Sequence, residues 1–194
     1  MWVNPQEQAS LKKLHLIIRM PAQYTDMGVE ELIGKMLGGE RHFPGMRLVV
    51  RANFTCHPRY EELERYLKQH QDLSREPLDL ERSSFLCVQA IGLYLPYAHL
   101  ANADFRGAYL QGANFVGADL TRTDLSDAKL SGSNIREANF ARTQLLETDF
   151  TGVTGLSEAL HLNMANFYRT RFSKKDKRDA KAAWKARTPF VFVK

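Results

Sequence analysis

Cys56 and His57 form the one adjacent thiol–imidazole pair in the sequence, a combination that can serve as nucleophile and base. Adjacent residues of a strand point to opposite faces, so these two side chains are not expected to meet. The remaining histidines show no metal-ligand spacing; they are His15, His42, His70, His99 and His161. Gly38-Gly39 lacks the lysine of a phosphate loop and is explained as a helix stop. We therefore expect a protein with no catalytic residue, no cofactor and no metal, with an enzyme in residues 1–77 as the alternative.

The size and composition describe a globular chain. It has 194 residues, of which 44% are apolar and 25% charged. Two cysteines, Cys56 and Cys87, cannot form a disulfide framework or a four-thiolate zinc site. No apolar run approaches the ~20 residues of a membrane span, and no secretory signal begins the sequence. We expect a cytoplasmic protein of bacterial type, and delivery as an effector into a host stays open as an alternative.

The net charge of +5 is unevenly distributed. Residues 1–77 carry +1, residues 78–152 carry −3 and residues 153–194 carry +7. The basic character therefore belongs to the C-terminal tail, whose cations are Lys174, Lys175, Lys177, Arg178, Lys181, Lys185 and Arg187. Such a cluster can bind nucleic acid or an anionic membrane, or it can be a solvated helix.

A repeat of five residues runs through the middle of the chain. A large apolar residue, the centre of each unit, recurs from Leu100 to Phe150, and a small residue precedes each centre by two. A helix would spread this pattern around its circumference, whereas side chains at i and i+2 of a short extended segment share a face. The predicted core consists of Phe85, Phe105, Leu110, Phe115, Leu120, Leu125, Leu130, Ile135, Phe140, Leu145 and Phe150.

A second period gives the number of sides. Glycines at 92, 112, 132 and 152 are spaced by 20, and each lies two residues after a centre. Glycine is favoured where a corner needs positive φ, so we expect corner glycines at Gly92, Gly112, Gly132 and Gly152. Twenty residues at five per side make a square coil, in which residue i stacks on residue i−20. Fifteen units from residue 78 to 152 make about four coils.

These units resemble the pentapeptide-repeat family, whose consensus is roughly A-(D/N)-(L/F)-x-x. Residues 103–107 (ADFRG), 113–117 (ANFVG) and 118–122 (ADLTR) match it closely. The resemblance implies a mainly β fold, a right-handed quadrilateral β-helix. We expect three parts: an N-terminal α/β cap or small module (1–77), the β-helix (78–172), and a basic C-terminal helix with a strand-like end (173–194).

The flanks are less regular. The residues from 15 to 19 and from 46 to 55 are strand-like, and those from 29 to 37 and from 58 to 69 are helical in pattern. Phe43 and Leu48 are five apart, so one early coil interrupted by residues 56–77 is an alternative to a separate module. Near Asn163 and Met164 the register shifts, which predicts a bulge or short helix before one or two final units. The segment from Lys174 to Lys185 is expected to be a helix that covers the end of the coil.

The solenoid surface offers charged columns. Arg82, Arg122 and Arg142 are multiples of 20 apart and should stack at one corner, while Asp104 and Asp124 should project from a neighbouring side. With the basic tail, these residues are the candidate interaction surface. The alternative is a solvated surface with weak cross-coil ion pairs.

Such a coil presents flat sides without a deep pocket, which favours a non-catalytic protein–protein interaction or scaffold module with an unknown protein partner. Two alternatives stay open. The resemblance implies that some family members bind DNA gyrase by imitating DNA, and the basic tail suggests an anionic partner. A homodimer through the C-terminal end would lengthen the rod.

Overall fold

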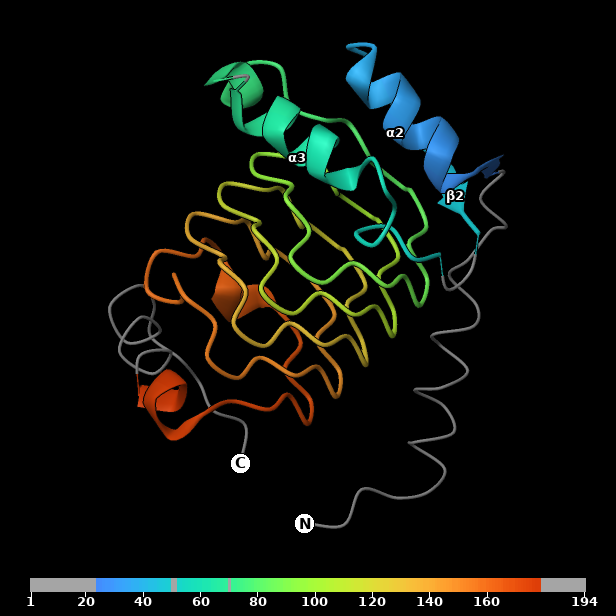
Figure 1. Ribbon diagram of the computed structural model, residues 1–194. Coiled ribbons are helices and arrows are strands. Elements are labelled where there is room, and N and C mark those ends of the chain that lie inside the picture. The colour runs from blue at the N-terminus through green and yellow to red at the C-terminus, as the bar shows by residue number, and fades with distance from the viewer. Residues whose placement is uncertain (1–23, 50–51, 70, 179–194) are drawn as a thin grey trace.

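The computed structural model describes residues 24–49, 52–69 and 71–178. Its main body is a stack of coils, with two helices lying across the N-terminal end (Figure 1). The named elements are β1 (Thr25–Met27), α2 (Val29–Leu37), β2 (Met46–Leu48), α3 (Tyr60–Gln69) and the 3-10 turns η1 (Gln71–Ser74) and η2 (Leu162–Met164). The strand expected at residues 15–19 lies outside the described residues.

The coil is built from parallel bridges between residues 20 apart. Asp79 pairs with His99, Asp104 with Asp124, and Tyr109 with Lys129, each as a single parallel bridge. Four such bridges occur in every 20 residues between residues 79 and 134, so the coil has four sides. We name the sides by one member: the Asp119 side, the Asp124 side, the Tyr109 side and the Asn114 side.

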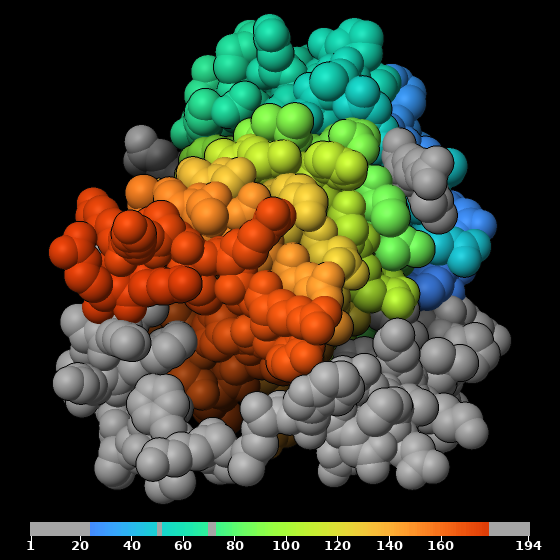
Figure 2. All heavy atoms as spheres, turned by 90° about the horizontal axis from the view of Figure 1, so that it is seen from below, coloured from blue at the N-terminus to red at the C-terminus, as the bar shows by residue number. Residues whose placement is uncertain are grey.

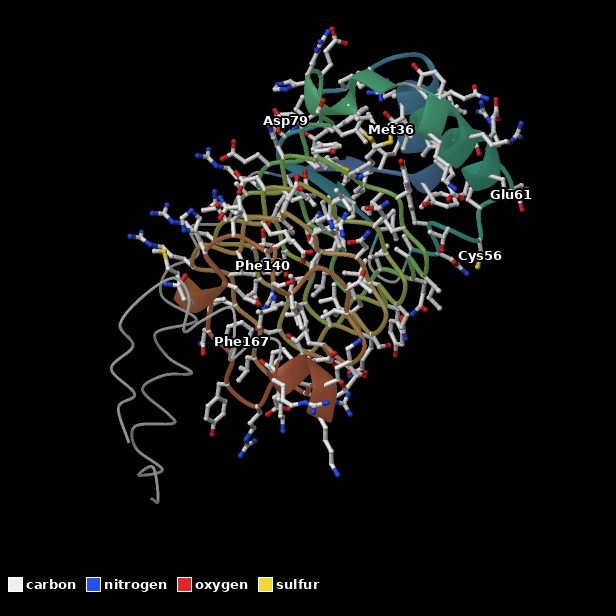
Figure 3. All side chains as sticks on the ribbon, turned by 90° about the vertical axis from the view of Figure 1, so that its left-hand side faces the viewer. Met36, Cys56, Glu61, Asp79, Phe140 and Phe167 are labelled. Atoms are coloured by element: carbon white, nitrogen blue, oxygen red, sulfur yellow. The ribbon has the colours of Figure 1, made fainter. Side chains whose placement is uncertain are left out.

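The interior is filled as the five-residue period predicts. Ten of the eleven predicted core residues have no exposed surface, and Phe85 is 4% exposed. Phe85 and Phe105 stack with ring centroids 4.5 Å apart, as expected for residues one coil apart. Figure 3 shows Phe140 inside the coil. At about 25 cal/mol per Å² of buried apolar surface, this column of Leu and Phe is the main stabilising term of the fold.

The corners have the backbone conformation that the glycine column predicts. Gly92, Gly112, Gly132 and Gly152 have φ between 66° and 73°. The other corners also have positive φ, including Arg122 (φ 58°) and other residues that are not glycine. Each corner is a turn in which an amide bonds back three residues, as Ala103 N–H does to the Leu100 carbonyl at 3.0 Å.

Stacking begins before residue 78. His42 pairs with Asp79, Arg47 with Ser84, and Asn53 with Gln89, so residues 42–53 lie above the first repeat coil on three sides. The early coil weighed as an alternative is therefore present, and β1 adds a further strand next to β2. The helix expected at residues 29–37 is α2, with Leu32, Ile33 and Met36 buried.

The C-terminal end shows the predicted shift in register. Asn139 pairs with Leu160, at 21 residues, because the chain between Thr154 and Leu160 holds one extra residue. Gln144 pairs with Asn166, at 22 residues, because the segment that contains η2 adds another. Residues 174–178 are helical, the described part of the predicted C-terminal helix. Seen from below, these last residues lie over the end of the coil (Figure 2).

Candidate interaction surface

The Asp and Asn residues of the sides serve the corners. Asp119 Oδ1 accepts hydrogen bonds from Thr121 N–H at 3.0 Å and from the Thr121 hydroxyl at 2.6 Å. Asn134 Oδ1 likewise accepts from Arg136 N–H at 3.2 Å. In each case the side-chain oxygen of Asp or Asn accepts a hydrogen bond from the backbone N–H two residues later in the turn. Asp and Asn at the second position of the five-residue consensus therefore stabilise the turns at the corners.

Asp104 and Asp124 behave in the same way, and this changes their expected role. Asp104 is 3% exposed, so it does not project as a docking side chain, contrary to the expectation from its column. Its carboxylate accepts from Arg106 Nε at 2.9 Å and Nη2 at 3.0 Å. Asp124 is half-buried and accepts from Ser126 N–H at 3.1 Å. The hydrogen bond to Asp104 raises the pKa of Arg106, so the guanidinium group stays charged.

The three arginines occupy one corner, between the Asp119 side and the Asp124 side. Arg82, Arg122 and Arg142 are exposed, and we call them the arginine corner. Arg82 lies 3.4 Å from Glu81, measured from Nε to Oε1. Within the described chain, Arg122 and Arg142 have no ion pair. Asn102 stands at this corner between Arg82 and Arg122.

The next corner around the coil has the opposite charge. It is formed by Cys87, Gly107, Asp127 and Glu147, of which Asp127 and Glu147 are exposed. Glu147 is paired with Arg169 at 3.0 Å, and this contact raises the pKa of Arg169. The remaining corners carry the glycine column and the set Tyr97, Gly117 and Glu137. Charge therefore changes from corner to corner around the prism.

The N-terminal end of the coil is closed by a buried phenol. On the Asn114 side, no strand of the described residues precedes Tyr94. Its N–H donates to the Tyr60 hydroxyl of α3 at 2.9 Å. That hydroxyl donates in turn to the Gly92 carbonyl at 3.4 Å. Burial raises the pKa of Tyr60, so it remains a neutral phenol. A side chain thus replaces the missing strand edge.

The C-terminal end is closed by a buried carboxylate. Gly132 N–H bonds to the Thr151 carbonyl one coil on, whereas Gly152 N–H bonds to Asp176 Oδ2 at 2.9 Å. The same oxygen accepts from Ser173 N–H at 2.9 Å, while the Ser173 hydroxyl accepts from Asp176 N–H. Residues 173–176 form a capping box with the sequence S-K-K-D. Burial acts to raise the pKa of Asp176, but the hydrogen bonds from Ser173 and Gly152 outweigh it and lower the pKa.

The basic tail is described only in part. Lys174, Lys175, Lys177 and Arg178 are exposed. Lys181, Lys185 and Arg187 lie outside the described residues. The described part of the tail therefore includes four of its seven predicted cations.

Cys56 and His57 do not form a dyad. Cys56 is exposed at the edge of the molecule near α3 (Figure 3). Both ring nitrogens of His57 are used elsewhere: Nε2 lies 2.7 Å from Glu30 Oε2, and Nδ1 accepts from Arg59 N–H. His57 therefore ties the loop before α3 to the start of α2. In the described parts of the chain, no group of three His, Cys, Asp or Glu side chains could hold a metal.

Sequence reasoning missed the two end caps and the role of the side carboxylates. The S-x-x-D pattern at residues 173–176 was a readable signal for a helix start. The Asp or Asn that precedes about half of the centres, as at Asp104, Asn114 and Asp119, was a signal for turn capping. For Tyr60 no local signal exists, because its partners lie more than 30 residues away.

The geometry defines a class of protein: a four-sided repeat scaffold of five-residue units, capped at both ends. The family model for pentapeptide repeats matches residues 92–127 and 118–154. Residues 92–154 therefore consist of pentapeptide repeats. Proteins of this family form right-handed quadrilateral β-helices.

Several solved structures resemble the chain. HetL, a pentapeptide repeat protein involved in heterocyst differentiation regulation in the cyanobacterium Nostoc sp. strain PCC 7120, is 20% identical, with a TM-score of 0.47. The match covers 66% of this chain but only 46% of HetL, so this chain spans about half the length of that protein.

Two further structures are similar over part of the chain. A pentapeptide repeat protein from the Arabidopsis thaliana thylakoid lumen is 28% identical over 52% of this chain and 68% of its own, with a TM-score of 0.37. Full-length QnrB1, a plasmid-mediated fluoroquinolone resistance protein, is 11% identical over 74% of this chain and 82% of its own, with a TM-score of 0.24. No curated protein matches the chain. These TM-scores are below 0.5, so no function is transferred from them.

No helix within residues 24–49, 52–69 and 71–178 is both long and apolar enough to cross a bilayer.

Proposed function

We propose that the protein is a non-catalytic protein–protein interaction module whose rigid coil presents its corners to a protein partner. The observation that carries this proposal is that interior, side and corner side chains have different roles in the coil. The interior is filled by Leu and Phe, and the side carboxylates serve turn amides. The corner side chains are left over for recognition, because the fold asks of them only a positive φ.

In this proposal the chain has three parts: a cap or module at 1–77, a β-helix of about four coils within 78–172, and a basic segment at 173–194. Strand stacking already involves residues 42–53, so the first part supports the coil as well as preceding it. Cytoplasmic location in a bacterium is part of this proposal. A homodimer through the C-terminal end is a second option, favoured by the half-exposed side chains of Met164 and Tyr168.

The DNA-mimic alternative is supported less well. Mimicry of a duplex, which carries one charge per ~1.7 Å, needs a regular column of free carboxylates. Here Asp104 is buried against Arg106, and the arginine corner adds opposite charge beside it. The acidic corner retains only Asp127 and Glu147, and Glu147 is paired.

The test is affinity capture from a nuclease-treated bacterial lysate, with bound proteins identified by mass spectrometry. The unmodified chain is compared with a version whose tail is neutralised. Because Asp176 closes the coil, this version keeps residues up to Arg178. It carries Lys174→Gln, Lys175→Gln, Lys177→Gln and Arg178→Gln. We expect one specific protein to be retained by both versions. Retention lost in the neutralised version would assign recognition to the tail, and no retained protein after nuclease treatment would refute the proposal.

A further inference from the structure

The arginine corner is a stripe of exposed cations with little internal compensation. The Arg82 side chain is 72% exposed, and Arg122 and Arg142 are also exposed. Coils stack at about 4.8 Å, so Arg122 and Arg142 lie one coil apart and Arg82 two coils above Arg122. The stripe therefore spans on the order of 14 Å along the edge of the prism.

The acidic groups nearest in sequence do not pair with the lower two arginines. Asp119 binds the backbone and hydroxyl of Thr121, and Asp124 binds Ser126 N–H. Arg142 is flanked on its two sides by the neutral residues Asn139 and Gln144. In the described chain, neither Arg122 nor Arg142 forms an ion pair, so both guanidinium groups face solvent with their donors free for a partner.

Local folding does not favour arginine at these positions. Arg122 has φ 58° and Arg142 has φ 61°, a region that favours Gly and Asn. The same corner accommodates Asn102, and another corner is glycine throughout. The coil would form at lower conformational cost with Asn at all three positions, so the cations are better explained by what they bind.

The residues beside the arginine corner favour an anionic partner that is only about one strand wide. A guanidinium group pairs bidentately with carboxylate or phosphate. A duplex, whose major groove alone is ~12 Å wide, would also cover the carboxylates of Asp119 and Asp124 on the two flanking sides. A single extended peptide needs only one strand width of ~4.8 Å and rises ~3.3 Å per residue, so four or five of its residues match the stripe.

We propose that the arginine corner docks an extended, carboxylate-rich segment of a protein partner. This inference rests on the proposed interaction role and names the partner class of that role. The basic tail contributes long-range attraction, while the corner arginines make the ion pairs.

The experiment measures fluorescence anisotropy of a labelled oligo-glutamate peptide titrated with the full chain. The test variant is Arg122→Asn with Arg142→Asn, because Asn102 shows that Asn fits this corner. The matched control is Lys174→Gln with Lys175→Gln, which removes the same charge from the tail. Circular dichroism melting checks that both variants fold, and a labelled oligothymidine of equal length replaces the peptide in a parallel titration.

We expect the corner variant to weaken peptide binding at least about tenfold at physiological ionic strength, and the tail control by less than about twofold. Equal losses in the two variants, or no peptide binding by the unmodified chain, would overturn the inference. Tighter binding of oligothymidine, lost in the corner variant, would overturn the partner class. A lysate partner retained equally by the corner variant would refute this inference while leaving the proposed function intact.

Discussion

The buried hydroxyl groups at the small-residue position differ in whether they form a hydrogen bond. Thr123, Thr143 and Thr148 occupy the small-residue position, and their hydroxyls donate to carbonyls of the preceding coil at 2.7–2.8 Å. Ser133 occupies the same position with no exposed surface, and its hydroxyl has no hydrogen-bond partner among the described residues. A buried polar group without a partner costs free energy, whereas a paired one contributes modestly.

Two substitutions at this position should therefore differ. Thr143→Val removes a made hydrogen bond at nearly constant volume and is expected to lower the free energy of unfolding by about 1 kcal/mol. Ser133→Ala removes an unpaired hydroxyl and is expected to be neutral or to stabilise by up to about 1 kcal/mol. Urea unfolding, analysed with one common dependence of the free energy of unfolding on urea concentration, measures both changes. A loss for Ser133→Ala as large as that for Thr143→Val would contradict this account.

The residue scale also shows how far the sequence alone could be read. The five-residue period predicts burial well, because a centre such as Phe105 can only point into the coil. The period does not predict what a side residue bonds to. Asp104 was expected on the surface by its column, but its carboxylate turned inward to a turn amide and Arg106.

At the scale of elements, the helices α2 and α3 were predictable because their apolar faces follow the helical period. The five-residue period does not predict the early coil, since residues 54–78 separate its last bridge residue from the first bridge residue of the repeats. Its registers of 36 and 37 residues follow from that insertion and not from any local pattern. The end caps depend on contacts between distant residues, such as Asp176 with Gly152.

The C-terminal cap should make stability depend on acid pH. The pKa of Asp176 is lowered in the folded protein, so its stabilisation is fully present above the unfolded carboxyl value of about 3.9 and is lost as pH falls through the lower folded value. Asp176→Asn is expected to cost about 1–2 kcal/mol at neutral pH. The gap from the unmodified protein should narrow below about pH 4.

Thermal melting across this pH range measures the gap. Asp127→Asn is the matched control, because Asp127 is exposed and forms no side-chain hydrogen bond in the described structure. It should change the melting temperature little at any pH. A gap for Asp176→Asn that stays constant down to pH 2–3 would mean that the carboxylate charge is not what closes the coil.

At the scale of the whole molecule, the coil is a one-dimensional stack in which each turn contacts only its neighbours. Stability should therefore be lost locally from an end that has lost its cap. Tyr60 closes one end and Asp176 the other, and several coils at about 4.8 Å each place the two caps on the order of 20 Å apart. Substitutions that far apart and without shared partners are expected to be additive.

Hydrogen exchange of single and double cap variants tests this picture. Tyr60→Phe should speed exchange near Tyr94 and leave residues 154–171 unchanged, because only the Tyr94 amide loses its acceptor. Asp176→Asn should speed exchange near Gly152 and leave residues 78–95 unchanged. The double variant should show both effects, with a stability loss equal to the sum within about 0.5 kcal/mol. Tyr109→Phe removes an exposed hydroxyl as control; a uniform rise in exchange along the chain would instead describe one cooperative unit in which the caps stabilise every coil equally.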